Sequence, residues 1–109
     1  MKKKLSFLSQ EDLSVIKSAT LPFRALNHKL RQQILAIIDE AQRKGKKICV
    51  TDIYVNLREE QSVVSQHLAI LRKVGVVKTE RNGKFIYYFV DKNKVREIVG
   101  KAKELAGIK

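Results

Sequence analysis

The stretch that decides the fold is TDIYVNLREEQSVVSQHLAILRKV, residues 51–74. Its first part, capped by Thr51 or Asp52, carries apolar residues at helical positions, and a second helical pattern begins near Gln61 after three charged residues. Gly75 follows, a residue type that often lies just beyond a helix end. Two short helices joined by a tight turn predict a helix-turn-helix over residues 51–74.

Residues 76–90 are predicted to form a β-hairpin. Asn82-Gly83 is a strong signal for a two-residue type I′ turn, and both flanks are rich in β-branched or aromatic residues. Two sets of side chains alternate along the second flank: Phe85, Tyr87 and Phe89 in one, Ile86, Tyr88 and Val90 in the other. One set must face the core. Exposed strand aromatics also serve as stacking platforms for single-stranded nucleic acid, but we interpret these residues as core packing.

A first helix is predicted near the N-terminus. Ser9 and Asp12 have the spacing of a capping box, and apolar residues follow at helical positions. Pro22 disfavours helical geometry at the residue before it and can break or restart the helix. We therefore assign residues 9–20 to this helix.

Two more helices complete the chain. Asn27 is expected to cap a helix that runs to Gly45, with apolar residues repeating at a 3.6-residue period. The last helix, residues 92–107, places its apolar residues within an arc of about 120°. The sequence thus predicts four helices, a hairpin and a final helix, a mainly α fold.

Composition limits the class of protein. The chain has 109 residues, 23 Lys and Arg against 11 Asp and Glu, and a net charge of +12. This length predicts a single domain, residues 1–109, with a basic arm at 1–8. The lone Cys49 cannot form an internal disulfide, and no apolar run is long enough to cross a membrane, so we expect a cytoplasmic protein. The charge favours nucleic acid as a partner, and an anionic membrane surface second.

The order of these elements is that of a winged helix-turn-helix, in which the hairpin over residues 76–90 is the wing. From about residue 25 to residue 90, and more loosely to the C-terminus, the chain resembles the ArsR/SmtB family of small dimeric transcriptional repressors. The segments that carry the resemblance, in order, are ALN at 25–27, CVTDI at 49–53, QSVVSQHLAIL at 61–71, VGVV at 74–77 and GKFIYY at 83–88. The resemblance implies a dimer that binds double-stranded DNA.

The helix that begins at Gln61 has one polar face, without a carboxylate, and one apolar face. At 100° per residue the polar face spans an arc of about 140° and holds Gln61, Arg72, Ser65, Ala69, Ser62, Lys73 and Gln66. Amides and hydroxyls suit base edges, and cations suit phosphates. We expect base contacts, at positions that family members use, from Gln61, Ser62, Ser65 and Gln66, and backbone contacts from Arg72 and Lys73. His67 falls on the apolar side and is interpreted as structural.

The tip of the predicted wing is also basic. Arg81 and Lys84 flank the turn and are expected to contact the DNA backbone or the minor groove. The alternative is a solvated tip whose charges only protect a strand edge from pairing.

Two metal-binding ligand sets are implied by the resemblance, and both are incomplete here. One is a Cys-x-Cys motif, in which Thr51 stands where the second cysteine would be. The other lies on the last helix, where the four positions read Asp91, Asn93, Glu104 and Gly107, with Glu104 only a partial substitute. We therefore expect no metal and no cofactor.

Other reactive residues point to no catalytic site. Cys49 is interpreted as a small buried apolar residue, with a redox switch as the alternative. His28 and His67 lie far apart in the chain and have no ligand-spaced partners. The sequence has no phosphate-binding loop, nucleophile motif or distinctive carboxylate pair, so we do not expect an enzyme.

The first and last helices, residues 9–20 and 92–107, are expected to form a two-fold dimer interface, as the resemblance implies. The candidate interface residues are Leu13, Ile16, Val95, Ile98, Val99, Ala102 and Leu105. Two recognition helices about one DNA turn apart would read an inverted repeat. The alternative is that the apolar stripe of residues 92–107 packs only on its own domain.

Two functions remain open from the sequence. The first is a homodimeric, sequence-specific repressor without a metal switch; the second is a protein-interaction or architectural module that binds DNA weakly and without specificity. Most of the positive charge lies outside residues 58–84, in residues 2–4 and in the cluster Arg43, Lys44, Lys46 and Lys47. These runs are expected to supply salt-dependent backbone affinity, while residues 58–84 supply sequence choice. The alternative is that the basic runs are simply solvated.

Overall fold

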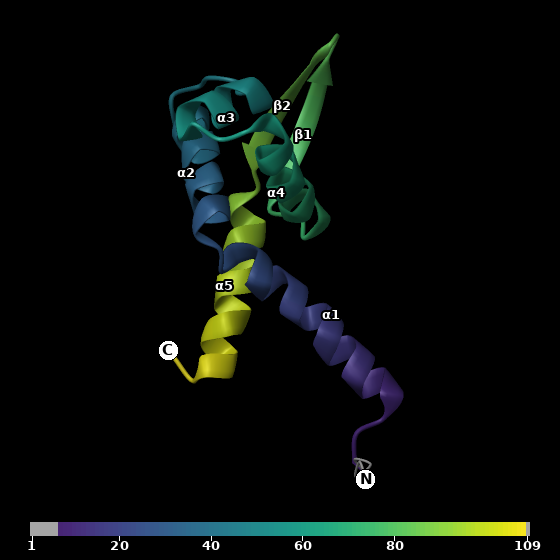
Figure 1. Cartoon of the computed structure of the whole chain (residues 1–109). Coiled ribbons are helices and arrows are strands. Elements are labelled where there is room, and N and C mark those ends of the chain that lie inside the picture. The colour runs from purple at the N-terminus through teal and green to yellow at the C-terminus, as the bar shows by residue number, and fades with distance from the viewer. Residues whose placement is uncertain (1–6, 109) are drawn as a thin grey trace.

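The computed structural model describes residues 7–108, and most of the basic arm at 1–8 lies outside that range. Five helices and one hairpin follow in the predicted order (Figure 1). Their bounds are α1 Gln10–Leu26, α2 Lys29–Arg43, α3 Val50–Leu57, α4 Gln61–Lys73, β1 Val77–Asn82, β2 Phe85–Val90 and α5 Lys92–Ala106. The mainly α winged helix-turn-helix is confirmed.

Helix α1 starts as predicted and ends later. The Ser9 hydroxyl accepts the Asp12 N–H at 2.9 Å, and the Asp12 carboxylate accepts the Ser9 N–H at 3.0 Å, which completes the capping box. The predicted end at residue 20 is wrong, because the helix continues through Pro22 to Leu26. A proline inside a helix costs about 3 kcal/mol. The turn that follows it packs Phe23 and Leu26 on the core and buries Ala25 completely, which offsets that cost.

Two helix caps differ from those predicted. His28, not Asn27, caps α2, and its Nδ1 accepts the Leu30 N–H at 3.2 Å. Helix α3 begins one residue before Thr51, with Cys49 as its cap, because the Asp52 carboxylate reaches back to accept the Cys49 N–H at 2.9 Å. In both cases the side chain that satisfies a backbone donor selects the start of the helix.

The turn between α3 and α4 is tight, as the helix-turn-helix prediction requires. Arg58 closes α3 in the left-handed conformation with φ of 55°, and the Glu59 N–H donates to the Tyr54 carbonyl at 3.0 Å. Helix α4 then begins at Gln61 and ends before Gly75, whose φ is +83°. This geometry fixes the crossing of α3 and α4.

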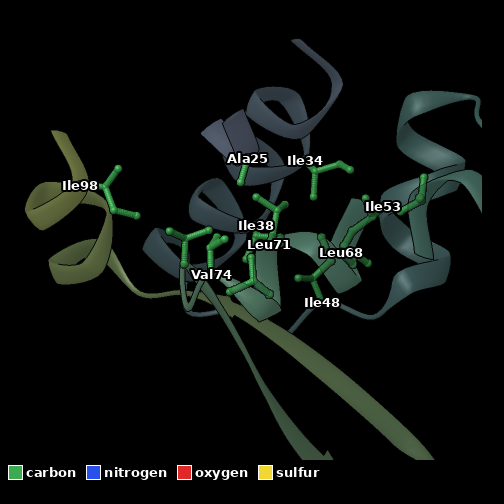
Figure 2. Packing of buried hydrophobic residues seen from close by; sticks show 12 residues of the cluster. Ala25, Ile34, Ile38, Ile48, Ile53, Leu68, Leu71, Val74 and Ile98 are labelled. Carbon is green, nitrogen blue, oxygen red and sulfur yellow. The ribbon is translucent and has the colours of Figure 1, made fainter. Parts of the chain in front are cut away.

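One hydrophobic core joins these elements (Figure 2). Ile34 and Ile38 of α2 meet Leu68 and Leu71 of α4, and all four side chains are at most 1% exposed. Ile53 of α3 completes the contact between these three helices. One face of α4 is therefore buried in the core, and the opposite face is exposed to solvent.

The wing is attached to this core at its base. The Tyr88 N–H donates to the Ile48 carbonyl at 2.9 Å, and the Asp91 N–H donates to the Val76 carbonyl at 2.9 Å. Tyr88 and Val90 pack against the core, so packing is confirmed for part of one alternating set. Phe85 of the other set is 49% exposed and stacks on Tyr87 with ring centroids 6.2 Å apart. Core packing is therefore wrong for Phe85.

The hairpin turn lies one residue later than predicted. Asn82 pairs with Phe85, so the two loop residues are Gly83 and Lys84 rather than Asn82 and Gly83. A type I′ turn needs positive φ at both central residues, and only Gly83 has it, at 63°. The glycine therefore takes the first central position, which is typical of a type II′ turn.

Two helical segments project from this body and are called the arms: residues 10–20 of α1 and 99–106 of α5. Every residue of both arms is exposed, and both point away from the wing (Figure 1). The radius of gyration is 17.2 Å. A compact chain of this length would have about 13 Å. We call residues 21–98 the head. Within residues 7–108, no helix combines the length and apolar character needed to cross a membrane.

Candidate DNA-binding surface

Helix α4 presents the face that the helical wheel predicts. All seven residues of the polar arc are exposed: Gln61, Ser62, Ser65, Gln66, Ala69, Arg72 and Lys73. On the opposite side Val64, Leu68 and Leu71 are buried in the core. Because α4 contains no Asp or Glu, nothing on this face repels a phosphate. Because the buried side of α4 packs in the core, the orientation of its exposed polar face relative to the rest of the protein is fixed.

The four candidate base contacts occupy the first two turns of this helix. The side chains of Gln61, Ser62, Ser65 and Gln66 make no hydrogen bond within residues 7–108, so their donors and acceptors point to solvent. In docked helix-turn-helix proteins the N-terminal residues of the recognition helix lie nearest the base edges. Arg72 and Lys73, the candidate backbone contacts, lie in the last turn of the same helix.

The wing carries a second polar surface. The Arg81 Nε donates to the Gly83 carbonyl at 3.2 Å, which orients the guanidinium at the tip. The ammonium of Lys84 lies 5.6 Å from the centre of the Phe85 ring, and that of Lys47 lies 5.4 Å from the Tyr87 ring. The cation–aromatic face of the wing is a feature that the sequence analysis missed, because it assigned both aromatic residues to the core.

The basic cluster at the end of α2, residues 43–47, is largely paired with carboxylates. Arg43 contacts Asp39 at 3.2 Å and Lys44 contacts Glu40 at 2.9 Å. Lys47 reaches Glu80 of β1 at 3.2 Å. Such exposed pairs each contribute about 0–1 kcal/mol and can open when a phosphate approaches. These pairs make the cluster less positive than its sequence suggests. The pairing of Lys47 could not be seen in the sequence, because Glu80 lies on a distant strand.

His67 lies on the inner side of α4, in keeping with its structural interpretation. Its Nδ1 accepts the Nε–H of Arg31 at 3.1 Å, and its ring centroid is 4.7 Å from that of His28. Burial lowers the pKa of His67, and the neighbouring His28 and Arg31 lower it further. The fold thus brings together two histidines that are 39 residues apart in the chain.

The residues at the family's metal-ligand positions serve other roles here. Cys49 caps α3, and burial raises the pKa of its thiol. Asp91 caps α5 by accepting the Lys94 N–H at 3.0 Å, and it pairs with Lys78 at 3.2 Å. Among the residues that the structure describes, no three His, Cys, Asp or Glu side chains gather as a metal site.

The candidate interface residues divide into two groups. Leu13, Ile16, Val99 and Leu105 are large, apolar and 38–79% exposed, and Ala102 is exposed beside them. Val95 is half-buried against the core, and Ile98 is only 6% exposed within it. The prediction that Ile98 lies on a free interface surface is therefore wrong for this chain, because Ile98 is buried in the core where α5 docks on the head.

A helix-turn-helix with a wing, and an exposed recognition helix free of carboxylates, define a winged-helix DNA-binding protein of the class that regulates transcription. The family model of bacterial regulatory proteins of the arsR family matches residues 28–79. The chain belongs to this ArsR family, whose members are transcriptional regulators and not enzymes.

Individual relatives agree with this assignment. The HTH-type transcriptional regulator YbzH of Bacillus subtilis is 36% identical over 89 residues, covering 72% of this chain and 85% of its own. The HTH-type transcriptional repressor SmtB of Mycobacterium tuberculosis is 34% identical, covering 85% of this chain and 65% of its own. The crystal structure of NolR from Sinorhizobium fredii superposes with a TM-score of 0.67 at 27% identity, covering 96% of this chain and all of that one.

Proposed function

We propose that this chain is a homodimeric, sequence-specific repressor that binds an inverted repeat in double-stranded DNA and blocks a promoter by occupying it. The observation that carries the proposal is the face of α4: seven exposed residues, amides and hydroxyls at its N-terminal end, cations at its C-terminal end, and no carboxylate. This is the arrangement that a helix in a major groove requires.

Each group of residues has its own role in the proposed complex. Gln61, Ser62, Ser65 and Gln66 read base edges, while Arg72 and Lys73 hold the backbone beside them. Arg81 and Lys84 bring the wing to the neighbouring backbone. Residues 2–4, together with the cluster that includes Lys46, add salt-dependent affinity without sequence choice.

The dimer is supported by the arms. The exposed apolar side chains of Leu13, Ile16 and Leu105 lie on two helices that project beyond the head. A second copy would bury them and place two α4 helices on one side of the DNA. The repressor role is supported by the similarity to the repressor SmtB. On this proposal residues 9–20 and 92–107 are the dimerisation helices of a single domain.

The proposed repressor has no metal switch, because Thr51, Asn93 and Gly107 stand where ligands would be needed. Zinc, cadmium and arsenite should leave its DNA affinity unchanged in a titration followed by fluorescence anisotropy. A tenfold or larger loss of affinity, an effect of about 1.4 kcal/mol, would contradict this part of the proposal.

Selection of bound fragments from genomic DNA tests the central proposal. We expect an inverted repeat with half-sites about one helical turn apart. Gln61→Ala and Gln66→Ala should each reduce discrimination against mismatched sites by about 1–3 kcal/mol, whereas Arg72→Ala should weaken binding to all sequences alike. Gln33→Ala, an exposed glutamine on α2, is the matched control and should change neither property.

Two outcomes would overturn the proposal. Equal affinity for random and selected DNA would favour an architectural or protein-interaction module instead. An unchanged preference in both glutamine variants would show that α4 does not read the bases.

A further inference from the structure

A cleft of about 410 Å³ lies where the second half of α1, the start of α2 and the inner side of α4 meet. Its lining combines four residues that carry hydrogen-bond donors with two apolar residues: Arg24, Asn27, His28 and Arg31, with Leu21 and Ile70. None of the lining residues is acidic. The cleft therefore offers donors and positive charge together with an apolar wall.

The donors of the cleft are only partly used. Arg31 donates its Nε–H to His67 at 3.1 Å and one Nη1–H to the Arg24 carbonyl at 3.2 Å, which orients the guanidinium and leaves its other N–H groups available. The Arg24 guanidinium makes no hydrogen bond or ion pair within residues 7–108. His28 accepts the Leu30 N–H at Nδ1, so the neutral ring carries its proton at Nε2 as a further donor.

The charges around the cleft are unbalanced. Two guanidinium groups border one small space, and the first turn of α2, whose N-terminus lies there, contains no acidic residue. The Glu59 carboxylate, which opposes the lowering of the His67 pKa, does not line the cleft. A bound anion would reduce the repulsion between Arg24 and Arg31 and would be favoured by the dipole of α2.

We propose that this α1/α2/α4 cleft is an effector site for a small organic anion, a carboxylate or phosphate ester with an apolar part. Arg24 and Arg31 would bind the anionic group, and Leu21 and Ile70 would contact the apolar part. The site itself stands on the geometry of the cleft, while its regulatory effect rests on the DNA binding proposed above.

Arg31 couples this cleft to the recognition helix. Its Nε–H holds His67, and Ile70, one turn further along the same helix, forms a wall of the cleft. Both residues lie on the side of α4 away from Gln61 and Ser65. An anion that draws the Arg31 guanidinium away from His67 removes a contact between α2 and α4, and it thereby lowers the affinity of α4 for DNA.

Binding is tested on the full chain without DNA. Benzoate and phenyl phosphate are titrated at constant ionic strength while the imidazole C–H resonances of His28 and His67 are followed by NMR, with uncharged benzamide as the control ligand. We expect saturable shifts with both anions, none with benzamide, and a rise in the pKa of His67 when the site is occupied. Arg24→Gln should weaken binding about tenfold, and Arg96→Gln, an exposed arginine on α5, should not.

Coupling is tested with the selected DNA site. Saturating benzoate should lower DNA affinity at least about fivefold in the parent protein and should have no effect in Arg24→Gln. Arg31→Lys keeps the positive charge but loses the forked donor, so it should still bind benzoate while the effect on DNA disappears.

The outcomes separate this proposal from the proposed function. Absent or benzamide-like shifts, or an Arg24→Gln variant that binds as the parent does, would overturn the anion site whatever the protein does with DNA. Anion binding that leaves DNA affinity unchanged would overturn the effector role. If no specific DNA site is found, the proposed function fails while the NMR result still decides the anion site.

Discussion

The head and the arms bury their apolar side chains to very different extents. In the head, Ile34, Ile38 and Ile53 are fully buried. In the arms, Ile16 is 52% exposed and Leu105 is 79% exposed. The arms and the helices of the head are both amphipathic and carry similar apolar residue types, so helical periodicity alone does not distinguish them.

This difference in burial indicates which part of the molecule has a hydrophobic core within a single chain. The head encloses a core among α2, α3, α4 and the base of the wing, and burial there contributes about 25 cal/mol per Å² of apolar surface. Every residue of the arms stays exposed, so the arms gain much less from burial within this chain. We therefore expect mutations to affect folding in the head and assembly in the arms.

Truncation of a core side chain should have the largest effect. Ile38→Ala removes a fully buried side chain between α2 and α4, and we expect the free energy of unfolding to fall by about 2–5 kcal/mol. Urea denaturation followed by circular dichroism measures this change. Val55→Ala, at a side chain in the head that is 62% exposed, is the control and should change it by less than about 0.5 kcal/mol. Equal losses of unfolding free energy in the two variants would contradict the assignment of Ile38 to the core and Val55 to the surface.

A charge in the arms should separate the subunits without unfolding the head. Ile16→Asp places a carboxylate in the proposed apolar interface, where burial without a partner is unfavourable. Sedimentation should show a species of 12.5 kDa for this variant and twice that mass for the parent. Ser18→Asp, on another side of α1, should leave the parent mass unchanged. A parent protein that sediments at 12.5 kDa at micromolar concentration would show that the arms do not pair.

The capping box of α1 gives a smaller and local effect. Ser9→Ala removes the acceptor of the Asp12 N–H and should destabilise the first turn of this arm by about 1 kcal/mol. Hydrogen exchange should then quicken in residues 10–14 and stay unchanged in α4. Ser14→Ala, within the same helix, is the control and should not quicken exchange. Slower folding or faster exchange in α4 would mean that the arm supports the head.

The pH dependence of the head should be the smallest effect. Burial lowers the pKa of His67 below its ordinary value of 6.5, helped by His28 and Arg31 and opposed by Glu59. Below pH 6.5 the unfolded chain therefore binds a proton that the folded chain does not, so the free energy of unfolding should fall as pH drops through 6.5 and level off below the folded-state pKa.

His67→Gln should flatten this part of the pH profile, as measured by urea denaturation at a series of pH values. Ile16→Asp should retain the slope, because the histidine lies in the head. If the unfolding free energy of the His67→Gln variant still falls with pH in this range, other titratable groups cause the pH dependence.

Much of the fold follows from local sequence. Capping signals, a 3.6-residue apolar period and a glycine in the turn predict the element order, and the wheel of α4 predicts each exposed residue of its polar face. Local signals also misplace details: the helix cap at Asn27, the end of the first helix at residue 20 and the hairpin turn at Asn82-Gly83. At the cap and the turn, a neighbouring residue is also suitable and the backbone geometry selects it. At the end of the first helix, packing of the last turn on the core carries the helix past Pro22.

By itself, the sequence determined which segments form helices and strands, and which face of α4 is polar, because these depend on residues a few positions apart. Only the tertiary structure decided that Ile98 belongs to the core, that Lys47 pairs with Glu80, and that His67 lies beside both His28 and Arg31. These contacts join residues that are distant in the chain. Their energies depend on how the helices pack around one core, which local periodicity does not encode.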